Sequence, residues 1–226
     1  MAMTMRVLKA IHTGWQAALL LLTTGCGGNA VLPADQAVIE RLTATREIHA
    51  IHFVEPSLGY LAPKNTSPLP AMHLDHPDFI DKIGVENPSE ALKSSFLALW
   101  KKQFPSLTVS PTPDAFPYRD LRELRTKYSP DLFFEFATDR WLLSGSYTEG
   151  PFLHIQLEAH AYLTDSVTGK ILWRGQCFAS KDLADENSGK RLTLKDLREL
   201  EWKPLKGAWK EAANACAREM VGQFSS

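Results

Sequence analysis

Residues 152–164, with the sequence FLHIQLEAHAYLT, alternate between apolar and polar side chains more regularly than any other stretch of the chain. The apolar positions are Leu153, Ile155, Leu157, Ala159, Ala161 and Leu163. Because successive side chains of a β-strand point to opposite faces, this period of two predicts a strand with one face in the core and the other in water. Such a strand is typical of an antiparallel sheet.

The residues that follow predict the partner of this strand. Residues 165–170, with the sequence DSVTGK, form a turn sequence in which Gly169 can adopt a positive φ. Residues 170–177 then predict a second strand, so we expect an antiparallel hairpin between the two segments. Two further strands are expected just upstream, at residues 131–138 and 140–147.

The rest of the chain alternates between helical and extended patterns. Residues 46–54 predict an interior strand because neither face is purely polar, and residues 107–109 predict a short strand. Helices are expected at residues 33–45, 89–104, 118–128, 193–201 and 205–224. Asp35 and Ser89 are expected to cap the first two helices. The whole pattern predicts an α/β (α+β) domain, in which helices pack on a mixed, largely antiparallel sheet of about five strands.

Composition indicates one ordinary globular domain. The chain has 226 residues, of which 44% are hydrophobic and 23% charged, and its formal net charge is −1. That balance contains no basic region of the kind that binds nucleic acid, so we expect no nucleic-acid partner.

The N-terminal residues have the three-part layout of a secretory signal. Arg6 and Lys9 form a basic start, and residues 15–22 form an apolar run of about eight residues. A helix needs about 20 apolar residues to cross the hydrocarbon core, so this run is too short for a permanent anchor. We expect residues 1–25 to be a signal peptide and residues 26–32 to be a tether.

The end of this segment, Thr23-Thr-Gly-Cys26, resembles the lipobox of bacterial lipoproteins, with Leu replaced by Thr at position 23. The resemblance implies cleavage before Cys26 and acylation of its thiol, so the protein would be held to a membrane by acyl chains. Gly27, which is not Asp, implies sorting to the outer membrane, with the domain facing the periplasm. The alternative is a plain secretory signal followed by an incidental cysteine.

If Cys26 carries the lipid, Cys177 and Cys216 remain as a pair in an oxidising compartment. Cys177 ends a predicted strand, and Cys216 lies on the apolar stripe of the helix at residues 205–224, which must face the sheet. We therefore predict a disulfide that links the C-terminal helix to the sheet. Metal ligation or a thiol nucleophile is the alternative, but no Cys-x-x-Cys spacing supports it.

Residues 55–88 contain six prolines and no regular pattern, which predicts a long insertion in the domain of residues 33–226. Within it, His73, His76 and Asp78 are weak candidates for metal ligands. An exposed polar turn explains these residues as well, because a zinc site needs a rigid scaffold and further ligands.

The polar face of the strand at residues 152–164 is a further candidate for a catalytic or metal site. His154, Glu158 and His160 share one face of the strand at residues 152–164, but strand geometry spreads them along a row, which favours a solvated face over a site. Ser144 lacks the flanking glycines of a nucleophile elbow. No catalytic residue, cofactor or small-molecule substrate is therefore assigned, and a periplasmic hydrolase or metal-binding enzyme remains the alternative function.

The hairpin sequence Leu163-Thr-Asp-Ser-Val-Thr-Gly-Lys-Ile-Leu-Trp173 resembles the strand–turn–strand of periplasmic lipoproteins with a fold like the TolB amino-terminal domain. The match covers about residues 131–177, and the order of elements agrees more loosely over residues 46–224. The resemblance implies a non-catalytic envelope lipoprotein with an assembly or protein-binding role, and hence an envelope protein partner.

Overall fold

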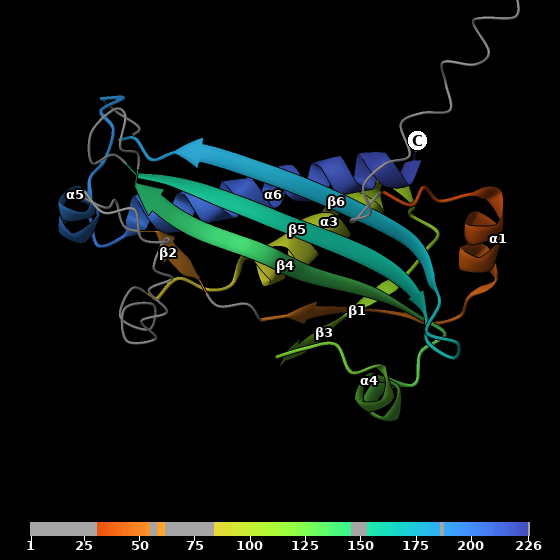
Figure 1. Cartoon of the computed structure of the whole chain (residues 1–226). Helices are drawn as coiled ribbons and strands as arrows, with labels where there is room; N and C mark the ends of the chain where they lie inside the picture. The colour runs from red at the N-terminus through yellow and green to blue at the C-terminus, as the bar shows by residue number, and fades with distance from the viewer. Residues whose placement is uncertain (1–30, 55–57, 62–83, 146–152, 186–187, 226) are drawn as a thin grey trace, which may run out of the picture. The chain divides into compact units, whose positions relative to one another are not determined.

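The structure is a computed structural model that describes residues 31–54, 58–61, 84–145, 153–185 and 188–225 (Figure 1). Its helices are α1 (Gln36–Ala44), α3 (Pro88–Gln103), α4 (Leu121–Tyr128), α5 (Leu194–Glu199) and α6 (Lys203–Ser225). Its strands are β1 (Ile48–Phe53), β2 (Gly59–Leu61), β3 (Val109–Phe116), β4 (Leu132–Gly145), β5 (Leu153–Asp165) and β6 (Ile171–Asp182).

The strands form one mixed sheet in the order β3-β1-β4-β5-β6, with β2 paired to the far end of β4. The pairings of β1 with β3, β1 with β4 and β2 with β4 are parallel, and the two long pairings of β5 are antiparallel. The mixed α+β fold is confirmed, as is the hairpin of β5 and β6. Gly169 has a φ of 73° in the turn between them, as expected.

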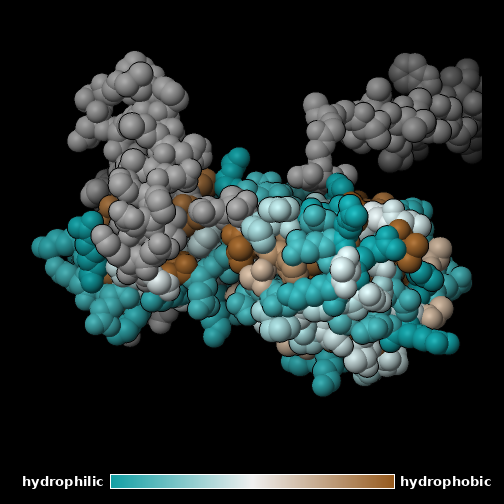
Figure 2. All heavy atoms as spheres, turned by 90° about the horizontal axis from the view of Figure 1, so that it is seen from below, coloured by the Kyte–Doolittle hydropathy of each residue, from teal (hydrophilic) through white to brown (hydrophobic). Residues whose placement is uncertain are grey.

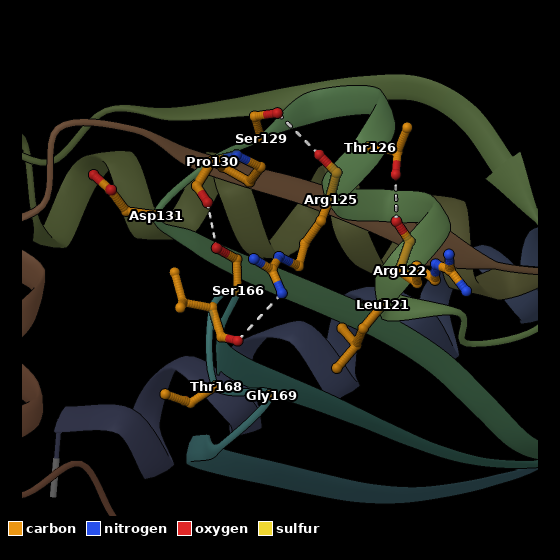
Figure 3. A pocket seen from close by; sticks show the side chains of 11 residues that line it. Leu121, Arg122, Arg125, Thr126, Ser129, Pro130, Asp131, Ser166, Thr168 and Gly169 are labelled. Atoms are coloured by element: carbon orange, nitrogen blue, oxygen red, sulfur yellow. Dashed lines mark hydrogen bonds between the residues drawn. The ribbon is translucent and has the colours of Figure 1, made fainter.

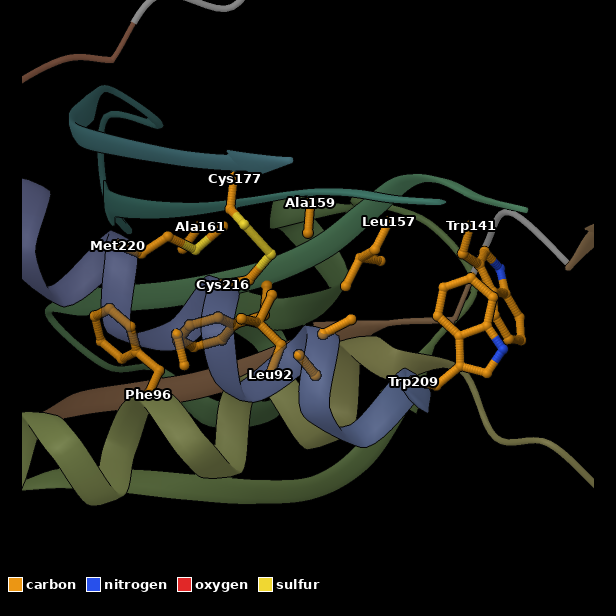
Figure 4. Packing of buried hydrophobic residues seen from close by; sticks show 14 of the residues in the cluster. Leu92, Phe96, Trp141, Leu157, Ala159, Ala161, Cys177, Trp209, Cys216 and Met220 are labelled. Atoms are coloured by element: carbon orange, nitrogen blue, oxygen red, sulfur yellow. A yellow bond between two sulfur atoms is a disulfide. The ribbon is translucent and has the colours of Figure 1, made fainter. Parts of the chain in front are cut away.

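Helices α3 and α6 pack side by side on one face of the sheet and enclose the main core (Figure 4). Aromatic rings join the layers: the ring centroids of Trp100 on α3 and Phe134 on β4 are 4.9 Å apart, and those of Trp173 on β6 and Phe224 on α6 are 5.1 Å apart. Rings of this size dominate core energetics because each buries a large apolar area. The predicted apolar stripes of both helices therefore face the core.

A smaller apolar cluster lies on the other face of the sheet, beneath α4. It contains Ile51, Phe53, Phe116, Leu124 and Phe133. The surface is mostly hydrophilic when viewed from below, with hydrophobic side chains in small separate areas (Figure 2). Helix α4 covers the part of this face near β1 and β3 (Figure 1).

Strand β4 replaces the two separate strands that were predicted at residues 131–138 and 140–147. Its register with β5 shifts between Thr138 and Arg140, so Asp139 is an extra residue in a β-bulge. The bulge changes the phase of the alternation: Phe134 and Phe136 face the main core before it, and Trp141 and Leu143 face the same core after it. The expected strand break was wrong because a bulge lets one strand continue through a change of phase.

The expected cap of α3 and the expected extent of the strand at residues 107–109 were also inaccurate. Asn87, not Ser89, caps α3 by accepting a hydrogen bond from the backbone N–H of Ser89, while the buried Ser89 hydroxyl donates to the carbonyl oxygen of Phe53 (2.6 Å). Strand β3 extends to Phe116 through Pro111, which is tolerated because β3 lies at the sheet edge. The insertion at residues 55–88 contributes β2 and the first residue of α3.

A buried lysine closes an irregular part of the sheet between β1 and β3. The register of these strands shifts between Ala50 and His52. Nζ of Lys93 on α3 lies 2.9 Å from Nδ1 of His52 and donates to the carbonyl oxygen of Thr112 (2.8 Å). Both side chains are almost fully buried, and burial lowers the pKa of Lys93. Burial, followed by the nearby Lys93, lowers the pKa of His52 to about 4. Lys93 therefore supplies a hydrogen bond to the Thr112 carbonyl oxygen beside the irregular pairing and a partner for the buried His52 ring.

Candidate functional site

The face of β4, β5 and β6 that is turned away from α3 and α6 carries most of the polar side chains of these strands; we call it the open face. Its β5 side chains are His154, Gln156, Glu158, His160 and Tyr162, which alternate with buried apolar residues as the sequence predicts. No helix of the described part of the chain covers this region, because α4 lies over β1 and β3 (Figure 1). Polar side chains are thus concentrated on the open face.

The first polar cluster on the open face is an ion pair between Arg119 and Glu135. Nε and Nη2 of Arg119 lie 2.6 Å and 3.2 Å from the two carboxylate oxygens of Glu135, whose side chain is fully buried. This two-point hydrogen bond to Glu135 raises the pKa of Arg119. Removing one partner would leave a buried charge, so the pair has a structural role in joining the segment before α4 to β4.

The second cluster surrounds the β4 bulge. The extra residue Asp139 points its carboxylate at His160, whose Nδ1 is 3.0 Å away. The rings of His160 and Tyr162 are 4.4 Å apart, and the guanidinium of Arg174 lies over Tyr162 at 5.2 Å. Burial raises the pKa of Tyr162. These four side chains therefore contact one another across three strands, although the buried Nε of Arg174 has no hydrogen-bond partner among the described residues.

The third cluster contains a serine and a histidine at hydrogen-bond distance. Nε2 of His154 lies 2.7 Å from Oγ of Ser144 and 3.1 Å from Nε2 of Gln156. A Ser–His pair is part of a hydrolase triad, but catalysis also requires an acid that orients the histidine. In the described residues no carboxylate contacts His154, and Ser144 is only 6% exposed. The pair thus lacks the geometry of a nucleophilic site.

A pocket lies at one end of the sheet, between α4 and the turn that joins β5 to β6 (Figure 3). The Arg125 guanidinium donates to the carbonyl oxygen of Val167 (3.3 Å), and the Ser166 hydroxyl donates to the carbonyl oxygen of Pro130. Its lining, as far as the structure describes it, contains no histidine or cysteine. Its described lining therefore offers no imidazole to act as a general base and no imidazole or thiolate to act as a soft metal ligand.

Among the residues predicted to form sites, the structure confirms the disulfide pair. Cys177 of β6 and Cys216 of α6 are bonded, with their Cα atoms 5.2 Å apart (Figure 4). The predicted lipidation residue Cys26 and the metal candidates His73, His76 and Asp78 lie outside the described residues. Within the described ranges no group of three or more His, Cys, Asp or Glu residues could hold a metal ion.

The predicted row of His154, Glu158 and His160 does not converge on one point. His154 contacts Ser144, His160 contacts Asp139, and Glu158 lies opposite Arg140 on β4. Sequence reasoning missed the Ser144–His154 contact because these residues meet only through the register of β4 and β5. None of the helices that the structure describes is long and apolar enough to cross a membrane.

Comparison with known proteins finds similarity among solved structures. No protein-family model and no curated protein matches the chain. Among solved structures, the chain is similar to the lipoprotein GNA1162 from Neisseria meningitidis, with 14% identity and a TM-score of 0.36 over 74% of this chain and 99% of that one. It is also similar to protein XCC0632 of the DUF330 family from Xanthomonas campestris, with 10% identity and a TM-score of 0.41 over 79% of this chain and 83% of that one. The resemblance to the TolB amino-terminal domain stays a prediction from the sequence.

Proposed function

We propose that this chain is a membrane-anchored envelope lipoprotein that acts by binding another envelope protein, without catalysis of its own. The observation that carries the proposal is the disulfide between Cys177 and Cys216. Disulfides persist in oxidising compartments such as the periplasm and are rare in the reducing cytosol. The bond therefore supports export independently of the N-terminal sequence.

The N-terminal sequence supports the same location. The basic start, the short apolar run and Thr23-Thr-Gly-Cys26 are typical of an exported and acylated protein. Each buried methylene of an acyl chain contributes about 0.8 kcal/mol, so two or more chains would hold the domain stably at a membrane. Gly27 after the acylated cysteine favours the outer membrane.

The open face supports a binding role over a catalytic one. On this face Arg119 pairs with Glu135, the His160 ring contacts Asp139, and the described residues bring no catalytic triad together. Metal analysis of the purified protein tests the enzymatic alternative, because a stoichiometric metal ion would contradict a purely binding role.

The test of the anchor is the Cys26→Ser variant of the full-length chain, expressed in a Gram-negative host. We expect the wild type to sediment with membranes and to carry the mass of its acyl chains, and the variant to lose both. Thr23→Leu, which restores the usual lipobox residue, is the matched control and should be processed at least as well as the wild type. Equal sedimentation of Cys26→Ser and wild type, with no lipid mass on either, would contradict the anchor.

The test of the compartment is thiol labelling of the exported protein without reduction. Because both residues are nearly fully buried, the labelling is done in denaturant, and Cys177 and Cys216 should still not react because both are in the disulfide. Labelling of both residues in the unfolded, unreduced protein would show that the domain does not reside in an oxidising compartment.

A further inference from the structure

The outer edge of β6 has a regular hydrogen-bonding pattern that ends partway along the strand. Arg174 exchanges two backbone hydrogen bonds with Leu32, at 3.0 Å and 3.1 Å. Two residues later, the side-chain amide of Gln223 on α6 accepts from the N–H of Gln176 (2.9 Å) and donates to its carbonyl oxygen (2.8 Å). Gln223 thus takes the place of a neighbouring strand at this position.

The same pattern continues beyond Gln176 without a partner. The register of β5 and β6 is unbroken from Trp173 to Asp182, so Phe178 and Ser180 direct their N–H and C=O groups outward, as Arg174 and Gln176 do. Among the described residues nothing hydrogen-bonds to the backbone of Phe178 or Ser180. The Phe178 side chain is also 62% exposed. Proteins normally block or cover such an edge, because it is a template for another strand.

A groove lies between this edge and helix α6, which forms the second wall of the groove. It is lined by Ala179, Ser180 and Lys181 from β6, and by Ala212, Ala215 and Arg218 among the residues of α6. The two alanines leave space beside the strand, and the disulfide fixes α6 at this distance (Figure 4). Lys181 is paired with Glu211, whereas no acidic side chain in the described part of the chain pairs with the exposed Arg218.

We infer that residues 178–182 bind an extended segment of a partner protein, which adds to the sheet as a strand beside β6. Only an extended main chain presents donors and acceptors at the spacing of the open groups of Phe178 and Ser180. Alternate side chains of that segment would enter the groove beside Ala212 and Ala215, and an acidic residue would meet Arg218. This inference rests on the proposed binding function and names its site and the chemistry of its ligand.

The probe is a library of random extended nonapeptides displayed on phage, selected against the full-length acylated protein in detergent micelles. We expect the selected peptides to carry an acidic residue at a fixed position. Ser180→Pro removes one outward N–H without breaking a bond to β5, and it should weaken binding by about tenfold. Native disulfide formation in that variant, checked by thiol labelling, verifies its fold.

Arg218→Glu tests the charge preference of the groove, which would not change if Arg218 had only a structural role. It should reverse the charge preference, so that peptides with a basic residue replace the acidic ones. Arg122→Glu on α4 makes the same charge change away from the groove and should leave the selection unaltered. Peptides that bind wild type and Ser180→Pro equally, or an unchanged preference in Arg218→Glu, would overturn the inference.

A second copy of the chain is the other occupant that the experiment can reveal. If wild type is a dimer in micelles and Ser180→Pro is a monomer by analytical ultracentrifugation, the edge pairs with itself and the partner segment is ruled out. The anchor is tested separately by Cys26→Ser. Peptide binding without lipidation would support the strand-binding site and contradict the lipoprotein. Lipidation without peptide binding would support the lipoprotein and contradict the site.

Discussion

The two edges of the sheet are protected in different ways. At the β3 edge, Pro111 and Pro113 cannot donate a backbone hydrogen bond, and the bulge beside β1 is held from within by Lys93. At the β6 edge, Leu32 and Gln223 cover two positions, and the groups of Phe178 and Ser180 stay open within the described structure. The comparison indicates that β3 lacks backbone donors at two positions, whereas β6 offers both N–H and C=O groups at Phe178 and Ser180.

The disulfide has the largest expected effect on the β6 side. Replacing both Cys177 and Cys216 with Ala removes a cross-link across 39 residues of sequence, and we expect the free energy of unfolding to fall by about 3 to 4 kcal/mol. Chemical denaturation measures this loss. Hydrogen exchange should show faster opening of α6 and β6, with β3 changed less. A loss below about 1 kcal/mol would contradict this entropic account.

The buried His52 should make the β3 side sensitive to acid. Its pKa is about 4 in the folded protein and 6.5 in the unfolded chain, so the unfolded chain binds more protons between these values. The stability that His52 contributes is complete above pH 6.5 and declines as the pH falls toward 4. The decline has an upper limit of about 3 kcal/mol, from a shift of this size.

The matched control is His52→Gln, which retains an acceptor for Lys93 and does not titrate. Denaturation curves measured at several pH values between 7.5 and 4 give the free energy of unfolding at each pH. This free energy should fall more steeply with decreasing pH in wild type than in the variant. Identical pH dependence in the two proteins would show that His52 is protonated equally in both states.

The Gln223 amide should have the smallest effect on stability and a visible effect on the edge. Gln223→Ala removes two hydrogen bonds to Gln176, and we expect a loss of about 1 kcal/mol and more self-association, because the open edge becomes longer. Gln223→Glu keeps the hydrogen-bond acceptor without the donor, so its stability should lie between those of wild type and Gln223→Ala. Unchanged stability and light scattering in Gln223→Ala would show that this amide does not protect the edge.

The parts of the fold that sequence could predict are those set by local patterns. The alternation of residues 152–164, the turn with Gly169 and the apolar stripe that carries Cys216 predicted the hairpin, the turn conformation and the disulfide. Each of these depends on neighbouring residues, or on one helix that must face the core.

The parts that could not be predicted depend on distant residues. Asp139 and Arg140 interrupt the apolar run of β4, and only the register with β5 shows that Asp139 is a bulge and not a turn. Lys93 follows Leu92 in an ordinary helix, and its contact with His52 requires the packing of α3 on β1. The open groups of Phe178 are main-chain groups, so their availability depends on which strands lie beside β6.

The place of β1 between β3 and β4 has a consequence for the order of folding. Ile48 pairs with Val109 and Leu132, so β1 waits for two segments that come much later in the chain, whereas β5 and β6 are joined by a short turn. Contacts at long sequence separation form slowly because loop closure costs entropy. In a chain that crosses a membrane from its N-terminus, β1 would emerge before β3 and β4 and would lack both sheet partners until those segments followed. Pulse-labelled hydrogen exchange should therefore show protection in β5 and β6 before β1, and a chaperone that holds extended segments would have its longest contact with β1.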